Sequence, residues 1–413
     1  MSVPTPSPHA REGPRPLPLH LARAASLWSS SLAALPLARN GSLPWSPVLT
    51  RAAAALAAPL AAADPEALAA ALAGEAARRL EEMLAGIEAY RRHPYRRRLR
   101  DPPVLWREGT TRLLDYGARR KERDKALPAL FVPSLVNRGY ILDLSRRHSL
   151  MRDLAGRGVR PLLVDWGAPG EAERTFGLDD YIAGRLEAAL DAAVAACGGP
   201  MAVVGYCMGG LLALALALRR PREVRGLALL ATPWDFHADN AAIGRLLAAA
   251  QAPLDAMLTA LSAFPVDLLQ TMFTWSEPTL VADKFRAFAR LDPESRHAED
   301  FVALEDWLND GVPLAGPVAR ECLVGWYGDN EPARGAWRVA GAPVRPEDLA
   351  LPALVVVPGR DRIVPPASAA ALADAIPGAE RLVPPAGHIG MVVGGAARAG
   401  LWRPLGDWLR ALH

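Results

Sequence analysis

The 413-residue chain predicts an α/β fold: a mostly parallel sheet with helices on both faces, an inserted helical cap and a mainly helical N-terminal region. Its residues are 51% apolar and only 22% charged, which excludes a mostly disordered chain. From about Val104, short apolar runs alternate with segments of helical periodicity, a pattern typical of a parallel sheet. The alternation stops between residues 237 and 346, where the sequence predicts helices inserted between two core strands.

The predicted elements divide the chain into four parts. Residues 1–20 are proline-rich, and we expect them to be disordered. Residues 21–103 predict a helical region, whose clearest helix begins at Pro65 with Asp64 as its N-cap. The α/β core takes residues 104–236 and 347–413, and the helical cap takes residues 237–346. Five apolar runs predict buried core strands, at residues 129–134, 160–166, 201–206, 226–232 and 353–359.

The charge balance and the cysteine count exclude two classes of protein, nucleic-acid binders and disulfide scaffolds. The net charge of +3, from 47 basic and 44 acidic residues, is too balanced to predict a nucleic-acid binder. The basic run at residues 91–100 predicts a solvated helix end and linker, with attraction to an acidic partner as the alternative. No secretory signal is recognisable, and three cysteines exclude a disulfide scaffold and fit a reducing compartment.

One uncharged stretch, residues 198–218, has the length of a membrane span. It opens with Gly-Gly-Pro and has three glycines near its middle. A buried strand, a glycine turn and a buried helix therefore explain it better than a transmembrane segment.

The centre of that stretch carries the strongest functional signal, the sequence Gly205-Tyr-Cys-Met-Gly-Gly210 between a predicted strand and helix. It is a nucleophile elbow with Cys207 in the position of the serine. The helix N-terminus after the turn favours the thiolate form of the cysteine. The backbone N–H of Met208 would point at the oxygen of a tetrahedral intermediate. The alternative is an inert buried cysteine beside a glycine-rich turn.

Two later residues favour the catalytic interpretation. Asp361 follows the predicted strand at 353–359, and His388 lies between glycines after a short strand. Alone, they could be a turn aspartate and a loop histidine. Together, Cys207, Asp361 and His388 have the nucleophile–acid–base order of α/β-hydrolase sites, and all three follow strands. Cys197 and Cys322 lack this setting and are predicted to be structural, and no spacing predicts a metal site.

From about Val104 to Leu412 the chain resembles the polyhydroxyalkanoate synthases. The resemblance includes GYCMGG around Cys207, GRDRIVPP around Asp361 and AGHIGM around His388. It extends to FVPSLVNRGYILDLS (131–145), VDWGAPG and LDDYI (164–182), TPWDF (232–236) and LEDWLNDGVPLAG (304–316). The LVNR stretch and the short catalytic part are most similar to the class III type, which works with a second subunit.

The resemblance implies polymerisation of (R)-3-hydroxyacyl-CoA thioesters into polyester with release of CoA. It implies that Cys207 carries the growing chain as a thioester, that His388 is the base, and that Asp361 orients it or helps activate the hydroxyl. The second oxyanion donor would be the backbone N–H of Leu135. No cofactor is implied, since acyl-CoA is the substrate. A homodimer, a second synthase subunit and attachment to polyester granules are implied as well.

Two features depart from this family. Arg362 follows Asp361 where the family usually has histidine, and residues 1–100 match no part of it that we can specify. The sequence thus leaves two alternatives to a polyester synthase. One is a thioesterase or polyester depolymerase that uses the same three residues, and the other is an inactive granule-associated homologue.

Overall fold

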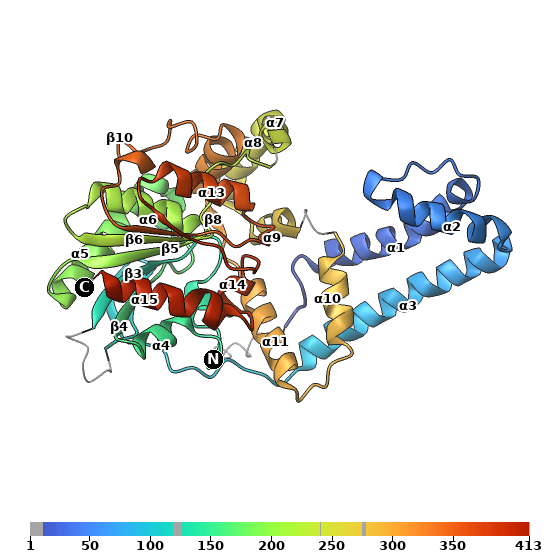
Figure 1. Ribbon diagram of the computed structural model, residues 1–413, viewed down its shortest axis with the longest axis horizontal. Helices are drawn as coiled ribbons and strands as arrows, with labels where there is room; N and C mark the ends of the chain where they lie inside the picture. Colours follow the sequence, from blue (N-terminus) through green and yellow to red (C-terminus); the bar gives the residue numbers. More distant parts are fainter. Residues whose placement is uncertain (1–10, 119–125, 240, 275–277, 413) are drawn as a thin grey trace, which may run out of the picture. The chain divides into compact units, whose positions relative to one another are not determined.

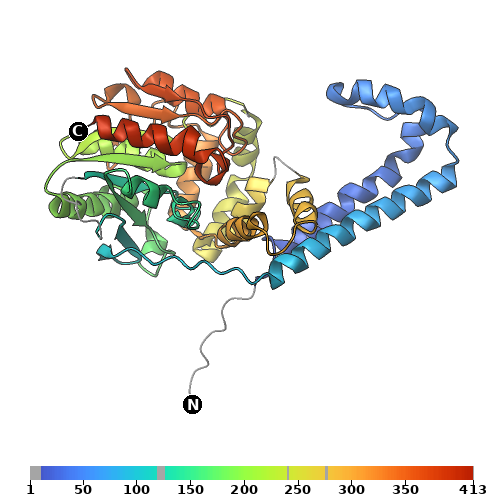
Figure 2. The same ribbon diagram turned by 60° about the horizontal axis from the view of Figure 1, so that its bottom comes forward.

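The structure is a computed structural model that describes residues 11–118, 126–239, 241–274 and 278–412. The chain forms two compact units (Figures 1 and 2). One contains residues 1–96 and 270–309, and the other contains residues 97–269 and 310–413.

The second unit is built on an eight-stranded sheet with the order β1-β2-β4-β3-β5-β6-β11-β12. Strand β2 runs antiparallel to both of its neighbours, β1 and β4. The six strands from β4 to β12 in this order are parallel to one another. The strand bounds are β1 Val104–Glu108, β2 Thr111–Asp115, β3 Leu127–Val132, β4 Val159–Asp165, β5 Met201–Tyr206, β6 Val224–Leu230, β11 Ala353–Val356 and β12 Glu380–Leu382. The predicted mostly parallel α/β sheet is confirmed.

Helices cover both faces of this sheet, α4 and α15 on one side and α5, α6 and α13 on the other (Figure 1). The central strands β3 and β5 read as continuous apolar runs because both of their faces are covered. The helices and turns that connect the strands are η3 Gly139–Leu142, α4 Leu150–Ala155, η4 Glu173–Thr175, η5 Asp180–Leu186, α5 Glu187–Cys197, α6 Met208–Arg219, η7 Pro346–Asp348, α13 Pro366–Ala375, α14 Gly390–Val393, η8 Arg398–Trp402 and α15 Arg403–Ala411.

The apolar stretch at residues 198–218 forms strand β5, a turn and helix α6, as the sequence predicts. Its hydrophobicity reflects burial inside the protein, since ten of the twelve residues of α6 are buried. No helix in the described part of the chain is both long enough and apolar enough to cross a bilayer.

The segment predicted as a cap divides between the two units. Residues 237–269 and 310–346 belong to the second unit, as α7 Ala241–Ala249, α8 Gln251–Leu261, β7 Ala263–Phe264, β8 Leu314–Ala315, α12 Gly316–Arg320, η6 Glu321–Gly328, β9 Arg338–Val339 and β10 Ala342–Pro343. Residues 270–309 belong to the first unit, with α10 Leu280–Phe288 and α11 Arg296–Asn309, and α9 Val266–Thr274 crosses the boundary. The observed units thus differ from the predicted domain bounds.

The first unit is helical, as predicted for the N-terminal region, with α1 Leu17–Arg39, η1 Pro47–Leu49, α2 Thr50–Ala62 and α3 Pro65–Arg92. Asp64 caps α3 by accepting a hydrogen bond from the N–H of Ala67 (2.8 Å). Buried side chains of α3 and α10, among them Met83, Ile87 and Phe285, form one apolar core. This packing between distant segments explains why residues 270–309 join the N-terminal helices.

The disorder expected for residues 1–20 is not observed where the structure describes them. Residues 1–10 lie outside the described part. Arg11 binds the carboxylate of Asp306 through Nε (2.6 Å) and Nη2 (2.8 Å), and α1 begins at Leu17. The ion pair of Arg11 and the start of α1 at Leu17 therefore give a defined structure to residues that composition alone predicts to be disordered.

Candidate active site

Cys207 lies between β5 and α6 in a strained backbone conformation, with φ 56° and ψ −130°. Residues other than glycine rarely adopt a positive φ, so the surrounding structure must hold Cys207 in this conformation. Two hydrogen bonds do so. The N–H of Cys207 donates to the carbonyl of Leu230 (2.9 Å), and its carbonyl accepts from the N–H of Gly210 (2.9 Å). This is the geometry of a nucleophile elbow.

The glycines of the motif are required by close contacts in the turn. A Cβ on Gly205 would lie 2.4 Å from the Cα of Gly210. A Cβ on Gly209 would lie 2.1 Å from the carbonyl oxygen of Val132, at the end of β3. The first turn of α6 therefore packs directly against the end of β3, and only glycine permits that approach.

The structure brings Asp361 and His388 together from the segments that follow β11 and β12. The Nδ1 of His388 lies 2.7 Å from one carboxylate oxygen of Asp361. The other oxygen accepts hydrogen bonds from the N–H groups of Ile363 (2.8 Å) and Val364 (2.9 Å), which fix the carboxylate. His388 also forms a hydrogen bond with Cys207. Because Nδ1 faces Asp361, Nε2 is the ring nitrogen that faces the thiol.

The electrostatics of the site favour the protonated form of His388. Burial by itself lowers the pKa of His388. The negative charge of Cys207 and the hydrogen bonds with Asp361 and Cys207 outweigh it and raise the pKa to about 10. At neutral pH His388 is therefore best described as an imidazolium held between Asp361 and Cys207.

Two tyrosines near the site are not among the residues that the sequence motifs predict. The ring of Tyr206 stacks on His388, with centroids 5.2 Å apart, and its hydroxyl donates to the His388 carbonyl (3.2 Å). Tyr327 comes from η6, and burial and the charge of Cys207 both raise its pKa. The position next to Cys207 could have indicated Tyr206, whereas no local pattern marks Tyr327.

The two predicted oxyanion donors belong to neighbouring segments. Met208 is the first residue of α6, and Leu135 lies in the buried loop that follows β3. The contact of Gly209 with the end of β3 brings this loop against the elbow. Leu135 also lines a small crevice with Trp166 and the segment 312–315. The volume of this crevice, about 10 Å³, is room for about one water molecule.

The remaining cysteines differ chemically from Cys207. Burial raises the pKa of Cys197, and burial together with the charge of Glu321 raises the pKa of Cys322. Both thiols are therefore protonated at neutral pH. Arg362, the departure from the family pattern, has an exposed side chain. In the described residues, no group of three or more His, Cys, Asp and Glu side chains is placed to hold a metal ion.

Known proteins similar to this chain identify its fold class and its family. Residues 130–394 match the family model of the alpha/beta hydrolase fold, so the second unit belongs to that fold class. Within it, the chain belongs to the poly(3-hydroxyalkanoate) polymerase family. It is 30% identical over 289 residues to "Poly(3-hydroxyalkanoate) polymerase subunit PhaC" of Allochromatium vinosum, covering 68% of this chain and 80% of that protein.

Two further relatives bear the same name. The protein of Haloferax mediterranei is 30% identical over 310 residues, 74% of this chain, and that of Synechocystis sp. is 30% identical over 297 residues, 70% of this chain. The chain spans 63% of the Haloferax protein and 79% of the Synechocystis protein. The family expected from the sequence motifs is thus confirmed.

Proposed function

We propose that this protein is a polyester synthase that transfers (R)-3-hydroxyacyl groups from CoA thioesters to a growing polyhydroxyalkanoate chain through a thioester on Cys207. The observation that carries the proposal is the Cys207–His388–Asp361 arrangement at the strand ends of a polymerase-family chain. A thiolate suits this chemistry because it is both a good nucleophile and a good leaving group.

In the acylation step, the Cys207 thiolate attacks the carbonyl carbon of the acyl-CoA thioester. The negative charge that develops on the carbonyl oxygen is stabilised by the N–H groups of Met208 and Leu135. The bond between the carbonyl carbon and the CoA sulfur then breaks. His388 gives its proton to the departing CoA thiolate, and Asp361 holds the imidazole in place.

In the transfer step, neutral His388 takes the proton from the 3-hydroxyl of the next monomer. The hydroxyl oxygen attacks the Cys207 thioester, an ester bond forms, and the carbon–sulfur bond breaks. Cys207 returns to the thiolate and His388 to the imidazolium, so the ion pair is restored. The chain has then grown by one unit.

We further propose that the protein works with a partner subunit, as a homodimer or with a second synthase subunit. The support is that the relatives are named as subunits. Since the proposed product is an insoluble polyester made from cytoplasmic thioesters, the protein would act in the cytoplasm at the granule surface. Its macromolecular substrate would be the polyester chain, not a nucleic acid.

The test is an assay of the purified protein with 3-hydroxybutyryl-CoA that follows free CoA thiol, polymer and free hydroxy acid separately. We expect CoA release with polymer. Cys207→Ala should abolish both, whereas Cys197→Ala, which removes a thiol outside the site, should retain them. Free hydroxy acid without polymer would show a hydrolase. No CoA release under any condition, including with a partner subunit, would show an inactive homologue.

A further inference from the structure

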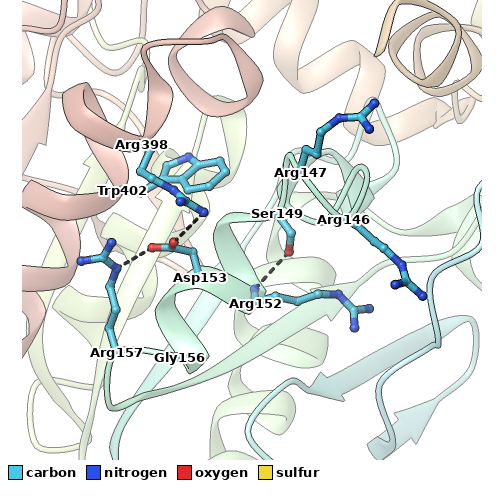
Figure 3. A pocket seen from close by; sticks show the side chains of 9 residues that line it. All are labelled: Arg146, Arg147, Ser149, Arg152, Asp153, Gly156, Arg157, Arg398 and Trp402. Atoms are coloured by element: carbon cyan, nitrogen blue, oxygen red, sulfur yellow. Dashed lines mark hydrogen bonds and ion pairs between the residues drawn. The ribbon is translucent and has the colours of Figure 1, made fainter. Parts of the chain in front are cut away.

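A second cavity lies in the α/β unit, beside α4 and η8, with a volume of about 410 Å³ (Figure 3). None of its lining residues belongs to the Cys207 site. Its charged lining consists of five arginines and one acid: Arg146, Arg147, Arg152, Arg157, Arg398 and Asp153. The lining has a strong excess of positive charge.

The one carboxylate in the lining is already shared. Asp153 accepts from the Nε of Arg157 (2.6 Å) and pairs with Arg398 (3.3 Å), as the dashed lines of Figure 3 show. Two guanidinium groups therefore compete for one acid. The unmet donors of both arginines remain next to the cavity.

Arg152 is held by a different carboxylate, which also binds a second arginine. The buried Asp143 binds Arg152 (2.7 Å) and also Arg97 (3.0 Å). Arg152 also donates a hydrogen bond to the carbonyl of Arg100 (2.8 Å). Arg97 and Arg100 come from the basic run that the sequence singles out, so part of that run supports this cavity. Four arginines around the cavity thus share two carboxylates: Arg97 and Arg152 share Asp143, and Arg157 and Arg398 share Asp153.

Arg146 and Arg147 extend from a braced turn before α4 (Figure 3). The N–H of Leu144 donates to the carbonyl of His148 (2.9 Å), and the Ser149 hydroxyl donates to Asp143 (2.6 Å). Arg146 is exposed and makes no hydrogen bond or ion pair with any residue that the structure describes. The turn therefore presents positive charge from a fixed backbone.

We propose that this cavity binds a small anion with two or more phosphate groups, a class that includes pyrophosphate, nucleoside diphosphates and the phosphorylated end of CoA. Guanidinium groups bind phosphate oxygens in pairs, and five arginines line this cavity. The cavity has the volume of small-molecule sites, which favours a compact ligand over a membrane or nucleic acid. The proposal does not depend on the polyester synthase activity.

The test is calorimetric titration of the full chain with pyrophosphate, ADP and CoA at an ionic strength of about 0.1 M, where exposed charges are largely screened. The variant Arg146→Ser/Arg398→Ser removes one guanidinium from each side of the cavity. Arg222→Ser/Arg345→Ser is the matched control, because both residues are exposed, lie in the same unit and lose the same charge.

We expect pyrophosphate to bind, and the cavity variant to weaken it about tenfold or more while the control variant binds as the wild type does. Tighter binding of CoA than of ADP would identify CoA as the ligand, and the reverse order a free nucleotide. Equal weakening in both variants, or no binding of any of the three anions, would overturn the proposal. So would binding of anionic phospholipid vesicles alone. Thermal melting of both variants separates lost binding from lost folding.

Discussion

Helices α6 and α2 have similar composition and opposite environments. Both are short and dominated by alanine and leucine, MGGLLALALALR in α6 and TRAAAALAAPLAA in α2. Ten of twelve residues are buried in α6, and none of thirteen in α2. The difference comes from the flanking sequence. A buried strand and a glycine turn fix α6 inside the sheet layers, whereas α2 lies between loops of the helical unit. Composition determines that these segments are helical, and neighbouring elements determine what they bury.

The largest effect should come from breaking the turn that positions α6. In Gly209→Ala the new Cβ would overlap the carbonyl oxygen of Val132, at 2.1 Å, and the backbone must move. We expect a loss of about 3 kcal/mol in the free energy of unfolding, measured by urea denaturation, and loss of the Cys207 geometry. Gly74→Ala in α3 is the control, because a Cβ there meets nothing within 4 Å. It should be neutral or stabilising.

The next effect concerns the charge state that the turn creates. With a folded-state pKa of about 10, against about 6.5 for an unfolded chain, His388 should remain protonated through neutral pH. The stability it contributes is then fully present below about pH 6.5 and lost as the pH rises through about 10. In Cys207→Ala the interactions of Cys207 that raise the His388 pKa are gone, and that pKa should fall.

NMR titration of the His388 ring in the wild type and in Cys207→Ala measures this directly. The midpoint should move down by more than about one unit, because both the charge and the hydrogen bond of Cys207 are removed. The ring of His148, which is outside the site, serves as the internal reference. An unchanged His388 midpoint would show that Cys207 does not raise the His388 pKa.

These predictions rest on features that the sequence predicts to different degrees. The elbow, the parallel sheet and the strand-end positions of Asp361 and His388 follow from local patterns, since glycine spacing and apolar runs constrain nearby backbone. The compact unit that joins residues 270–309 to α3 does not follow. Periodicity indicates that Met83 and Phe285 each belong to an apolar face, but pairing those faces depends on three-dimensional fit.

The same distinction holds within the site. Tyr206 is adjacent to Cys207 in the sequence, and its stacking on His388 is a direct result of the elbow. Tyr327 reaches the vicinity of Cys207 from η6, and no spacing rule connects the two. The arginines around α4 come from separate segments, so the sequence shows the basic run at 91–100 but not the cavity next to it.

Truncating one leucine in each helix tests whether α6 and α2 differ in the free energy that their side chains contribute to folding. Leu214 in α6 is fully buried, at 0% exposure. Leu214→Ala removes its side chain from a closed core that cannot fully collapse, and we expect a loss of about 3 kcal/mol in the free energy of unfolding. A loss below about 1 kcal/mol would mean that the core around α6 rearranges to fill the space.

Leu56 in α2 is the other member of the pair, with 49% of its surface exposed. Leu56→Ala should change the free energy of unfolding by less than about 0.5 kcal/mol, because little apolar surface returns to water and alanine is the better helix former. Urea denaturation, followed separately through the helical unit and the α/β unit, gives the value. A loss comparable to that of Leu214→Ala would show that α2 buries Leu56 against a partner in solution. The difference in burial between α6 and α2 would then hold only for the chain without that partner.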